Sequence, residues 1–424
     1  MKTSRARTVA VVGVLALVGV VAAIGGLRAC NSDRLLHDGA TGAAGSVAEF
    51  LARHWADPIA AQGSPPASFS GLEASLDPAA CGQCHAAQHA DWKTSLHSRA
   101  MGPGLRWQLH LMSQADANAC LRCHAPLAEQ KALLAREMQW PQAPSSPPPA
   151  YVPPRLHLEG LTCAACHMRR HQRFGPPAAG SAPVASAPAP HGGFAAHEAF
   201  RDSQFCAPCH QFPPEGARLN GKLIENTYEE WRASPAARAG QSCQHCHMPG
   251  ARHLWRGIHD ADMVRQGLHA SLQVRRAAAG RLSVVAELAN VGAGHHLPTY
   301  LIAEIVATLT LVGGTGEPLA VLGRHVIARK ADLDLTRELS DTRLAPGERF
   351  RWEREVSAPA GSGQMVELRV EVHPGKHYED LFKSVLERPQ PPGGSAGVLL
   401  RQALEHLRRV PYESHLIRQP MPAR

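Results

Sequence analysis

Apolar and polar residues alternate in the second half of the chain. Segments 282–288, 305–311 and 366–372 each place an apolar side chain at every second position. A period of two puts those side chains on one face of a strand, which predicts three half-buried β-strands. Several such strands joined by Gly- and Pro-containing turns predict a small all-β domain, an immunoglobulin-like sandwich, over residues 271–378.

A helical period follows the strands. Apolar residues recur at helical spacing in 396–409, which predicts an amphipathic helix within a C-terminal helical segment, 379–424. Residues 75–270 instead contain two runs rich in proline, alanine and serine, 141–154 and 175–193. Such runs form exposed, extended loops. We therefore expect short helices and turns between them, in a mainly α-helical and irregular domain.

An uncharged apolar run occupies the N-terminus. Val9–Leu27 has no charged residue and follows three basic residues. At about 1.5 Å per residue it is long enough, as a helix, to cross a bilayer. Residues 1–29 are therefore expected to be a signal sequence or a membrane anchor, and residues 30–74 a tether.

The residues after this run leave three outcomes open. The string Leu27-Arg28-Ala29-Cys30 resembles a bacterial lipoprotein processing site, from which Arg28 departs because a small or apolar residue is expected there. A lipid on Cys30, an uncleaved single-span anchor and ordinary cleavage all export the chain. We expect it on the periplasmic or cell-surface side of a bacterial membrane, either tethered there or secreted into the periplasm.

The composition is unusual for a chain of 424 residues. It is 44% hydrophobic but only 5% aromatic, and it contains 25 histidines. Aromatic side chains dominate the energetics of ordinary cores, so we expect a group other than side chains to fill part of the interior. The formal net charge is +8 without a dense run of Lys and Arg, which argues against a nucleic-acid partner.

Ten of the eleven cysteines fall into one pattern, Cys-x-x-Cys-His, which occurs five times. The copies are Cys81-Cys84-His85, Cys120-Cys123-His124, Cys163-Cys166-His167, Cys206-Cys209-His210 and Cys243-Cys246-His247. This is the attachment motif of c-type haem, in which two thiols form thioethers and the adjacent histidine binds the iron as the proximal ligand. The motifs predict five covalently bound haem c groups. They lie so close in sequence that the haems must pack against one another, which explains the scarcity of aromatic residues.

Other uses of paired cysteines account for the pattern less well. Zinc ribbons do not require a histidine after every second cysteine. A thioredoxin-like redox site needs one such motif beside a βαβ pattern. Disulfide scaffolding is compatible with an exported protein, but it gives no reason for the five histidines.

The sequence around the motifs resembles a known family. Trp92, Ser95 and His97 follow the first motif, and the strings "GLTCAACHMRRH" and "FCAPCHQF" surround the third and fourth. These features resemble the multihaem c-type cytochrome family that includes the tetrahaem cytochrome of ammonia oxidisers, and the chain looks like a pentahaem relative over about residues 75–270. The resemblance implies electron transfer, and it implies that His97 supplies an iron ligand.

Enzymes related to this family offer a contrast. Pentahaem nitrite reductases have a lysine in place of the motif histidine at the catalytic haem, whereas all five motifs here end in histidine. Octahaem hydroxylamine oxidoreductases carry a crosslinking tyrosine with no evident counterpart among the five tyrosines here. The resemblance therefore favours an electron carrier over a catalyst.

A carrier haem typically has a second axial ligand, His or Met. Besides His97, seven histidines lie near a motif or in the Gly-rich turn before Pro298. They are His157 and His171 beside the third motif, His197 before the fourth, His253 and His259 after the fifth, and His295 and His296, of which one is expected to bind. Met168 and Met248 directly follow proximal histidines and are too close to reach the opposite face of the same haem, so we expect them to pack.

These patterns predict an exported pentahaem c-type cytochrome that relays electrons between redox partners. The expected partners are other cytochromes or a membrane quinol-linked enzyme, with the N-terminus attached to the membrane. The alternative is a multihaem oxidoreductase that acts on a small nitrogen or sulfur compound at one haem with an open axial site. A third hypothesis is a docking subunit whose β domain holds a partner protein.

Overall fold

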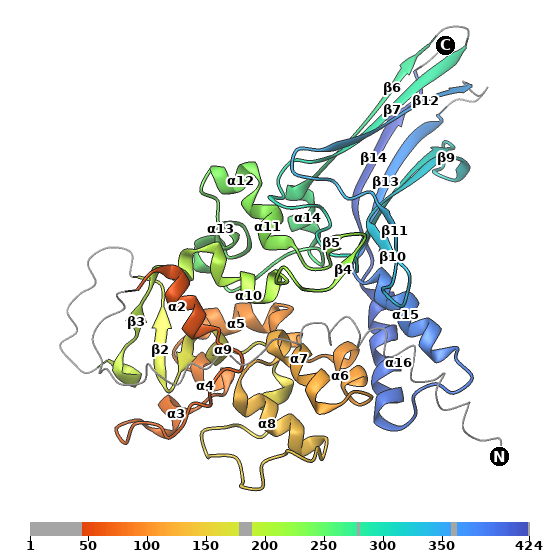
Figure 1. Ribbon diagram of the computed structural model, residues 1–424. Coiled ribbons are helices and arrows are strands. Elements are labelled where there is room, and N and C mark those ends of the chain that lie inside the picture. Colours follow the sequence, from red (N-terminus) through yellow and green to blue (C-terminus); the bar gives the residue numbers. More distant parts are fainter. Residues whose placement is uncertain (1–44, 178–188, 278–279, 358–362, 423–424) are drawn as a thin grey trace, which may run out of the picture. The chain divides into compact units, whose positions relative to one another are not determined.

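The computed structural model describes residues 45–177, 189–277, 280–357 and 363–422 (Figure 1). The predicted signal or anchor, Cys30 and part of the 175–193 run lie outside these residues. The chain divides into two compact units, which we call the helical unit (45–217, 241–255 and 392–400) and the β unit (218–240, 256–391 and 401–422). Within the described residues, no helix combines the length and the apolar character needed to cross a membrane. The domain boundaries that the sequence indicates stay predictions.

The helical unit consists of short helices joined by turns. The α-helices are α2 (Val47–His54), α3 (Gly71–Ala74), α4 (Pro78–Gly82), α5 (Ala86–Thr94), α6 (Pro103–Leu109), α7 (Gln114–His124), α8 (Ala128–Glu137), α9 (Cys163–His167), α10 (Ala207–His210) and α13 (Cys243–His247). The 3₁₀ turns are η1 (His97–Arg99), η2 (Leu156–Leu158), η3 (Pro190–Gly192), η4 (Glu198–Arg201), η5 (Ser203–Phe205) and η6 (Pro249–Ala251). One small sheet joins β1 (Met168–Arg169), β2 (Gln172–Gly175) and β3 (Ala195–Ala196).

Local sequence explains where several of these helices begin. Ser46 caps α2 and Ser70 caps α3, each in a reciprocal pair of hydrogen bonds with a glutamate three residues later. This capping box satisfies backbone N–H groups that the first helical turn leaves open. Proline occupies the first position of α4 and of α6, where its missing N–H costs nothing.

The helical unit has several small apolar clusters. One lies around Leu127 and Leu156, a second around Leu121, and a third around Phe50 and Ala199. The first and third draw on segments from different parts of the chain, and the second draws on the consecutive helices α6, α7 and α8. Side-chain packing in the described part of this unit is therefore divided among separate patches.

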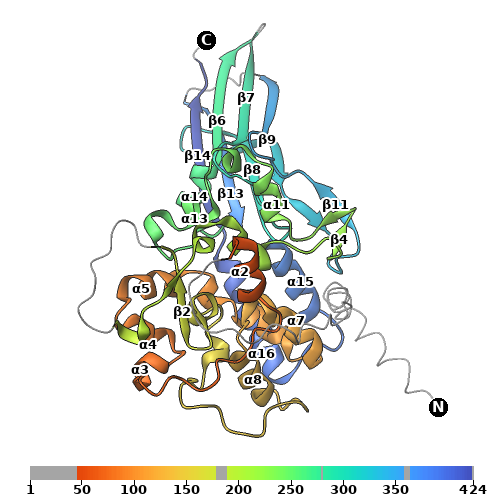
Figure 2. The same ribbon diagram turned by 60° about the vertical axis from the view of Figure 1, so that its left-hand side comes forward.

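The β unit is built from antiparallel strands. Its strands are β4 (Arg218–Leu219), β5 (Lys222–Leu223), β6 (Leu268–Arg276), β7 (Arg281–Asn290), β8 (Glu304–Val312), β9 (Pro318–Ile327), β10 (Arg329–Ala331), β11 (Glu338–Asp341), β12 (Arg349–Ser357), β13 (Met365–His373) and β14 (Tyr412–Pro420). The larger sheets have the orders β14-β13-β8-β9 and β12-β7-β6 (Figures 1 and 2). β4 pairs with β5, and β10 pairs with β11.

The two larger sheets share one apolar core. Val284 on β7, Leu309 on β8 and Val370 on β13 are fully buried in the same cluster. The three alternating segments of the sequence lie within these three strands, so the mixed helical and β fold class is confirmed. The immunoglobulin-like form of the sandwich stays a prediction.

The helices of the β unit are short, apart from those near the C-terminus. They are α11 (Thr227–Arg232), α12 (Pro235–Arg238), α14 (Ala261–Gly267), α15 (Lys376–Leu386) and α16 (Gly394–Arg409), whose residues divide between the two units after Leu400. The amphipathic helix expected at 396–409 lies within α16. The sequence analysis did not foresee β14, which adds to the sheet beside β13.

Arg329 anchors the β4–β5 hairpin from inside the β unit. Its side chain is almost fully buried, and its guanidinium donates to the carbonyl oxygens of Leu219, Lys222 and Leu223. Its Nε–H donates to Glu338 over 2.9 Å. A buried cation is tolerated when its donors are satisfied and a carboxylate balances the charge, and here both conditions hold.

Candidate haem-binding sites

All five Cys-x-x-Cys-His motifs lie in the helical unit, and each is wound into helical turns. The third and fifth motifs form α9 and α13, the second ends α7, and the fourth lies at α10. The first passes from α4 to His85, the residue that precedes α5. In a helical turn, residues three and four apart lie on one face. The two cysteines and the histidine of a motif therefore point to the same side.

Two proximal histidines are oriented by backbone carbonyl groups. Nδ1 of His124 lies 2.8 Å from the carbonyl oxygen of Ala100, and Nδ1 of His167 lies 2.8 Å from that of Phe174. Because a carbonyl oxygen only accepts, Nδ1 carries the proton in each ring. The neutral ring then presents its Nε2 lone pair, the form in which histidine binds a metal.

The third motif has the ring of a second histidine close to that of its own. The ring centroids of His167 and His253 lie 6.1 Å apart, with 33° between the ring planes. Two histidines on one iron place their nitrogens about 4 Å apart and their ring centroids about 6 Å apart. Nδ1 of His253 lies 3.0 Å from the carbonyl oxygen of Ala251, which leaves its Nε2 for the metal. These residues fit a haem ligated by two histidines.

The fourth motif shows the same arrangement with a different partner. The ring centroids of His97 and His210 lie 6.3 Å apart, at 53°. Burial, together with the nearby His210, lowers the pKa of His97 to about 3. His97 is therefore neutral at physiological pH, as an iron ligand must be. Its buried Nδ1 lacks a hydrogen-bond partner among the described residues.

The Trp-x-x-Ser-x-His segment has a clear local structure. The Trp92 indole N–H donates to the carbonyl oxygen of Leu161 over 2.8 Å, and the N–H of Leu161 donates to the carbonyl oxygen of His97 over 2.9 Å. Ser95 turns the chain between them by donating to the carbonyl of Trp92. Gly160 has a φ of +64°, and a Cβ there would lie 2.4 Å from the His97 carbonyl oxygen. A glycine is thus required where the two backbones meet.

Cysteines of different motifs lie in contact. Thiol contacts join Cys81 to Cys163, Cys123 to Cys209, and Cys206 to Cys243. The contact with Cys163, more than any other group, lowers the pKa of Cys81 to about 7. The ten cysteines that the structure describes form no disulfide. These contacts place the first attachment loop beside the third, and the fourth beside the second and the fifth.

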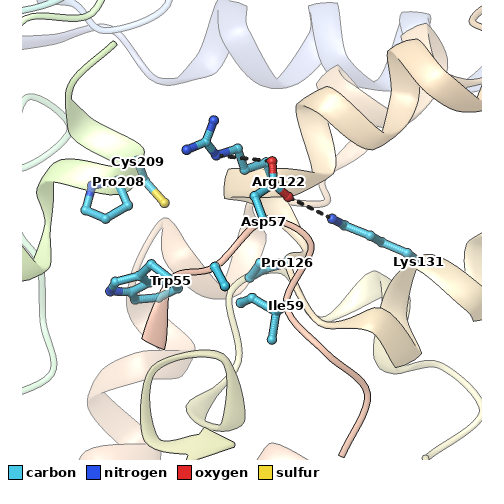
Figure 3. Close-up of a pocket in the computed structure, with 9 residues that line it drawn as sticks. Trp55, Asp57, Ile59, Arg122, Pro126, Lys131, Pro208 and Cys209 are labelled. Carbon is cyan, nitrogen blue, oxygen red and sulfur yellow. Dashed lines mark ion pairs between the residues drawn. The ribbon is translucent and has the colours of Figure 1, made fainter. Parts of the chain in front are cut away.

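Figure 3 shows a small hollow between the second and fourth motifs. Cys209 faces it from the fourth motif and Arg122 from the second. Asp57 lies between two cations, 3.6 Å from Nε of Arg122 and 3.8 Å from Nζ of Lys131. The single carboxylate leaves the hollow with one excess positive charge.

Three predicted distal ligands have other hydrogen bonds. His157 pairs with Glu137, and Nε2 of His171 lies 3.1 Å from the carbonyl oxygen of Gly63. Nδ1 of His197 accepts the backbone N–H of Ala199. Within the described segments, none of the three is in ring contact with a motif histidine. Their role as ligands stays a prediction.

Three further predicted ligands, His259, His295 and His296, belong to the β unit. Nδ1 of His295 lies 2.8 Å from the carbonyl oxygen of His296. The backbone N–H of His296 donates to Glu230, and its Nδ1 lies 3.2 Å from the same carboxylate. Whether any of these side chains binds a haem also stays a prediction.

The sequence analysis missed His54, which lies on α2 in the segment expected to be a tether. Nε2 of His54 donates to the carbonyl oxygen of Cys166, within the third motif, over 2.8 Å. The ring stacks on Phe50, and burial lowers its pKa to about 3. The sequence could have predicted this helix, because Ser46 and Glu49 form a capping box and Phe50 and His54 follow one helical turn apart.

The chain is similar to known proteins in one segment of its sequence and in its fold. Residues 80–143, which include the first two motifs and Trp92 to His97, match the family described as cytochrome c554 and c-prime. The fold is similar to that of a penta-heme cytochrome c552 from Thermochromatium tepidum, with a TM-score of 0.58 and 19% identity over 82% of this chain and 100% of that chain. No curated protein sequence matches the chain. The family match over residues 80–143 and the five attachment motifs agree with the resemblance to multihaem c-type cytochromes, and the similarity to the solved structure shows a shared fold.

Proposed function

We propose that the protein is an exported pentahaem c-type cytochrome that relays electrons through closely packed haems. One observation carries the proposal: the rings of two motif histidines each lie near the ring of a second histidine, with a centroid separation that fits two ligands of one iron. An iron held on both sides has no position for substrate, which is typical of a carrier. The contacts among motif thiols support close packing of the sites.

The chain's own residues would hold and orient the haems. The ten motif cysteines would bind them covalently, and the five motif histidines would bind the irons. Carbonyl groups such as those of Ala100 and Phe174 fix the proximal rings through Nδ1. When bound, haem iron supplies one-electron chemistry. Desolvation lowers the pKa of His97 to about 3, which keeps its ring neutral.

A second candidate function is favoured by the other motifs. His85 and His124 have no histidine ring at ligand spacing within the residues that the structure describes. An iron with an open axial position at one of them would allow a small nitrogen or sulfur compound to bind. The protein would then be an oxidoreductase at that haem and a carrier at the others.

Low-temperature EPR of the ferric holoprotein separates the two functions. A carrier should show low-spin signals from all five haems and no change on adding cyanide or nitrite. A high-spin signal close to one haem per protein, lost on adding cyanide, would overturn the pure carrier.

Single variants test the two ligand pairs. His253→Ala and His97→Ala should each convert one haem from low-spin to high-spin while the protein keeps five haems. His325→Ala, a half-buried histidine stacked on Phe350 in the β unit, is the matched control and should leave the spin states unchanged. If neither ligand variant creates a high-spin haem, the ligand pairs are wrong.

The proposal also includes export and a membrane-side location. The basic N-terminus, the run Val9–Leu27 and the five haem-attachment motifs support it. We further propose redox partners at the membrane, such as other cytochromes or a quinol-linked enzyme. Cell fractionation of the full chain and of Cys30→Ser tests this part. Wild type in the cytoplasmic fraction would contradict export, and release of Cys30→Ser alone would identify a lipid anchor.

A further inference from the structure

Trp255 contacts both of the second histidines described above. Its ring lies edge-on to His97 with centroids 4.8 Å apart and to His253 with centroids 5.2 Å apart. These two histidines are far apart in the sequence, and their rings lie near the proximal histidines of different motifs. A single indole therefore packs against one ligand of each of two sites.

The backbone at Trp255 is held in an unusual conformation. Its φ is +43°, in the left-handed region that bulky residues rarely adopt. Such strain persists only where the surrounding contacts determine the conformation, and it is typical of functional sites. We therefore expect contacts of the residues just before Trp255 to hold its backbone in this conformation.

A buried carboxylate supplies the strongest of these contacts. Asp91, on α5 just after the first motif, accepts from Arg252 through Nη2 over 2.6 Å and through Nε over 2.7 Å. It also accepts the backbone N–H of His253 over 3.1 Å. Asp91 is 6% exposed. Bidentate pairing of this kind fixes geometry as well as charge, so it fastens the segment that carries both His253 and Trp255.

We propose that Trp255, held by the Asp91–Arg252 pair, is a positioning residue that sets the ring orientations of His97 and His253 together. Edge-on contact with the indole opposes rotation of each imidazole about its Cβ–Cγ bond. The angles of 53° and 33° to the proximal rings then depend on one side chain. The inference rests on the proposed function, because it takes His97 and His253 to be iron ligands.

EPR of the ferric holoprotein tests the proposal, because the g-values of a low-spin haem with two histidines depend on the angle between the imidazole planes. Trp255→Ala should shift the g-values of two of the five haems together, while haem content stays at five. Trp255→Phe keeps an aromatic edge and should shift the same two signals less. Asp91→Asn, which weakens the bidentate pair, should move the same signals.

Trp352→Phe is the control, since Trp352 is a buried tryptophan in the β-unit core that contacts Phe350 and His325. It should leave all five signals in place. Unchanged g-values in Trp255→Ala, or a shift in only one haem, would overturn the proposal. If Trp255→Ala does not fold, unchanged signals in both Trp255→Phe and Asp91→Asn would overturn it.

The ligand variants keep the two failures distinct. If His97→Ala and His253→Ala each create one high-spin haem but the Trp255 variants change nothing, only the positioning role is wrong. If the ligand variants create no high-spin haem, the ligand pairs and this inference fail together.

Discussion

The two units differ in what holds them together. The β unit has one core that two sheets share, with Val284, Leu309 and Val370 fully buried in it. The helical unit has several small clusters and helices of at most 11 residues among its complete α-helices, of which α7 is the longest. Isolated helices of that length are marginal in water. The contrast indicates that side-chain packing organises the β unit and that cofactor attachment organises the helical unit.

Removing the haems should have the largest effect, and it should fall on one unit only. In full-length protein produced without haem attachment, amides of α7 and α9 should lose nearly all protection from hydrogen exchange, because their clusters are too small to order them. Amides of β7, β8 and β13 should stay protected. Hydrogen exchange with mass spectrometry measures the protection of both sets of amides, with the holoprotein as reference. Protected α7 and α9 amides in the protein without haem would contradict the inference that haem attachment organises the helical unit.

Truncation inside the β core should come next. Leu309→Ala removes a fully buried side chain, and we expect a loss of roughly 2–5 kcal/mol in the free energy of unfolding of the β unit. Hydrogen exchange of the β7, β8 and β13 amides across a denaturant series measures this loss, with haem absorbance as the readout for the helical unit. Leu319→Ala, at a side chain that is 47% exposed, is the control and should cost much less. An equal loss of unfolding free energy in Leu309→Ala and Leu319→Ala would contradict a packed core around Leu309.

A buried carboxyl group should make the β unit sensitive to pH. Burial raises the pKa of Glu225 to about 8, so the folded state binds a proton that the unfolded state releases above its ordinary pKa of about 4.3. The bound proton therefore stabilises the folded state. Its contribution to the free energy of unfolding is fully present below the unfolded-state pKa and is lost as the pH rises toward 8, at about 1.4 kcal/mol per pH unit.

Glu225→Gln should remove that part of the pH dependence. Denaturation midpoints of the β unit at pH 5, 6.5 and 8 compare the two proteins. A wild-type midpoint that does not fall relative to the variant would show that Glu225 is ionised in the fold.

The smallest effect is expected at a helix cap. Ser46→Ala removes the α2 capping box and should cost about 1 kcal/mol locally. Exchange of α2 amides should then become roughly five-fold faster, while the melting of the helical unit barely changes because the haems hold it. Ser46→Asp, which keeps a capping oxygen, should restore protection. A large fall in the melting temperature of Ser46→Ala would mean that helix capping contributes more to the stability of the helical unit than we infer.

Periodicity predicted the β unit better than the helical unit. Alternation at 282–288, 305–311 and 366–372 corresponds to β7, β8 and β13. Successive side chains of a half-buried strand alternate between the core and the solvent, so its sequence alternates between apolar and polar residues. β14 was not foreseen, since its pairing with β13 depends on the chain returning after α16. The short helices around the motifs have no comparable signal, because their order comes from capping residues and from attachment chemistry.

Within the haem sites, the sequence likewise predicted the attachment residues better than the second iron ligands. The attachment residues were identifiable because the two thiols and the histidine of one haem occupy a fixed spacing in one helical turn. The second ligands have no fixed spacing. His157, His171 and His253 all lie close to a motif in sequence, yet among them the structure brings only His253 opposite a motif histidine within the described residues.

The sequence by itself determined the number of attachment motifs, the identity of their cysteines and histidines, and three strands of the β core, β7, β8 and β13. Each of these depends on residues close together in the chain. Tertiary structure decided that His253 faces the third motif and His97 the fourth, that His54 reaches the carbonyl of Cys166, and that Trp255 contacts two ligand rings. Those contacts join residues far apart in sequence, so they exist only after the backbone has folded and the buried polar groups have found their partners.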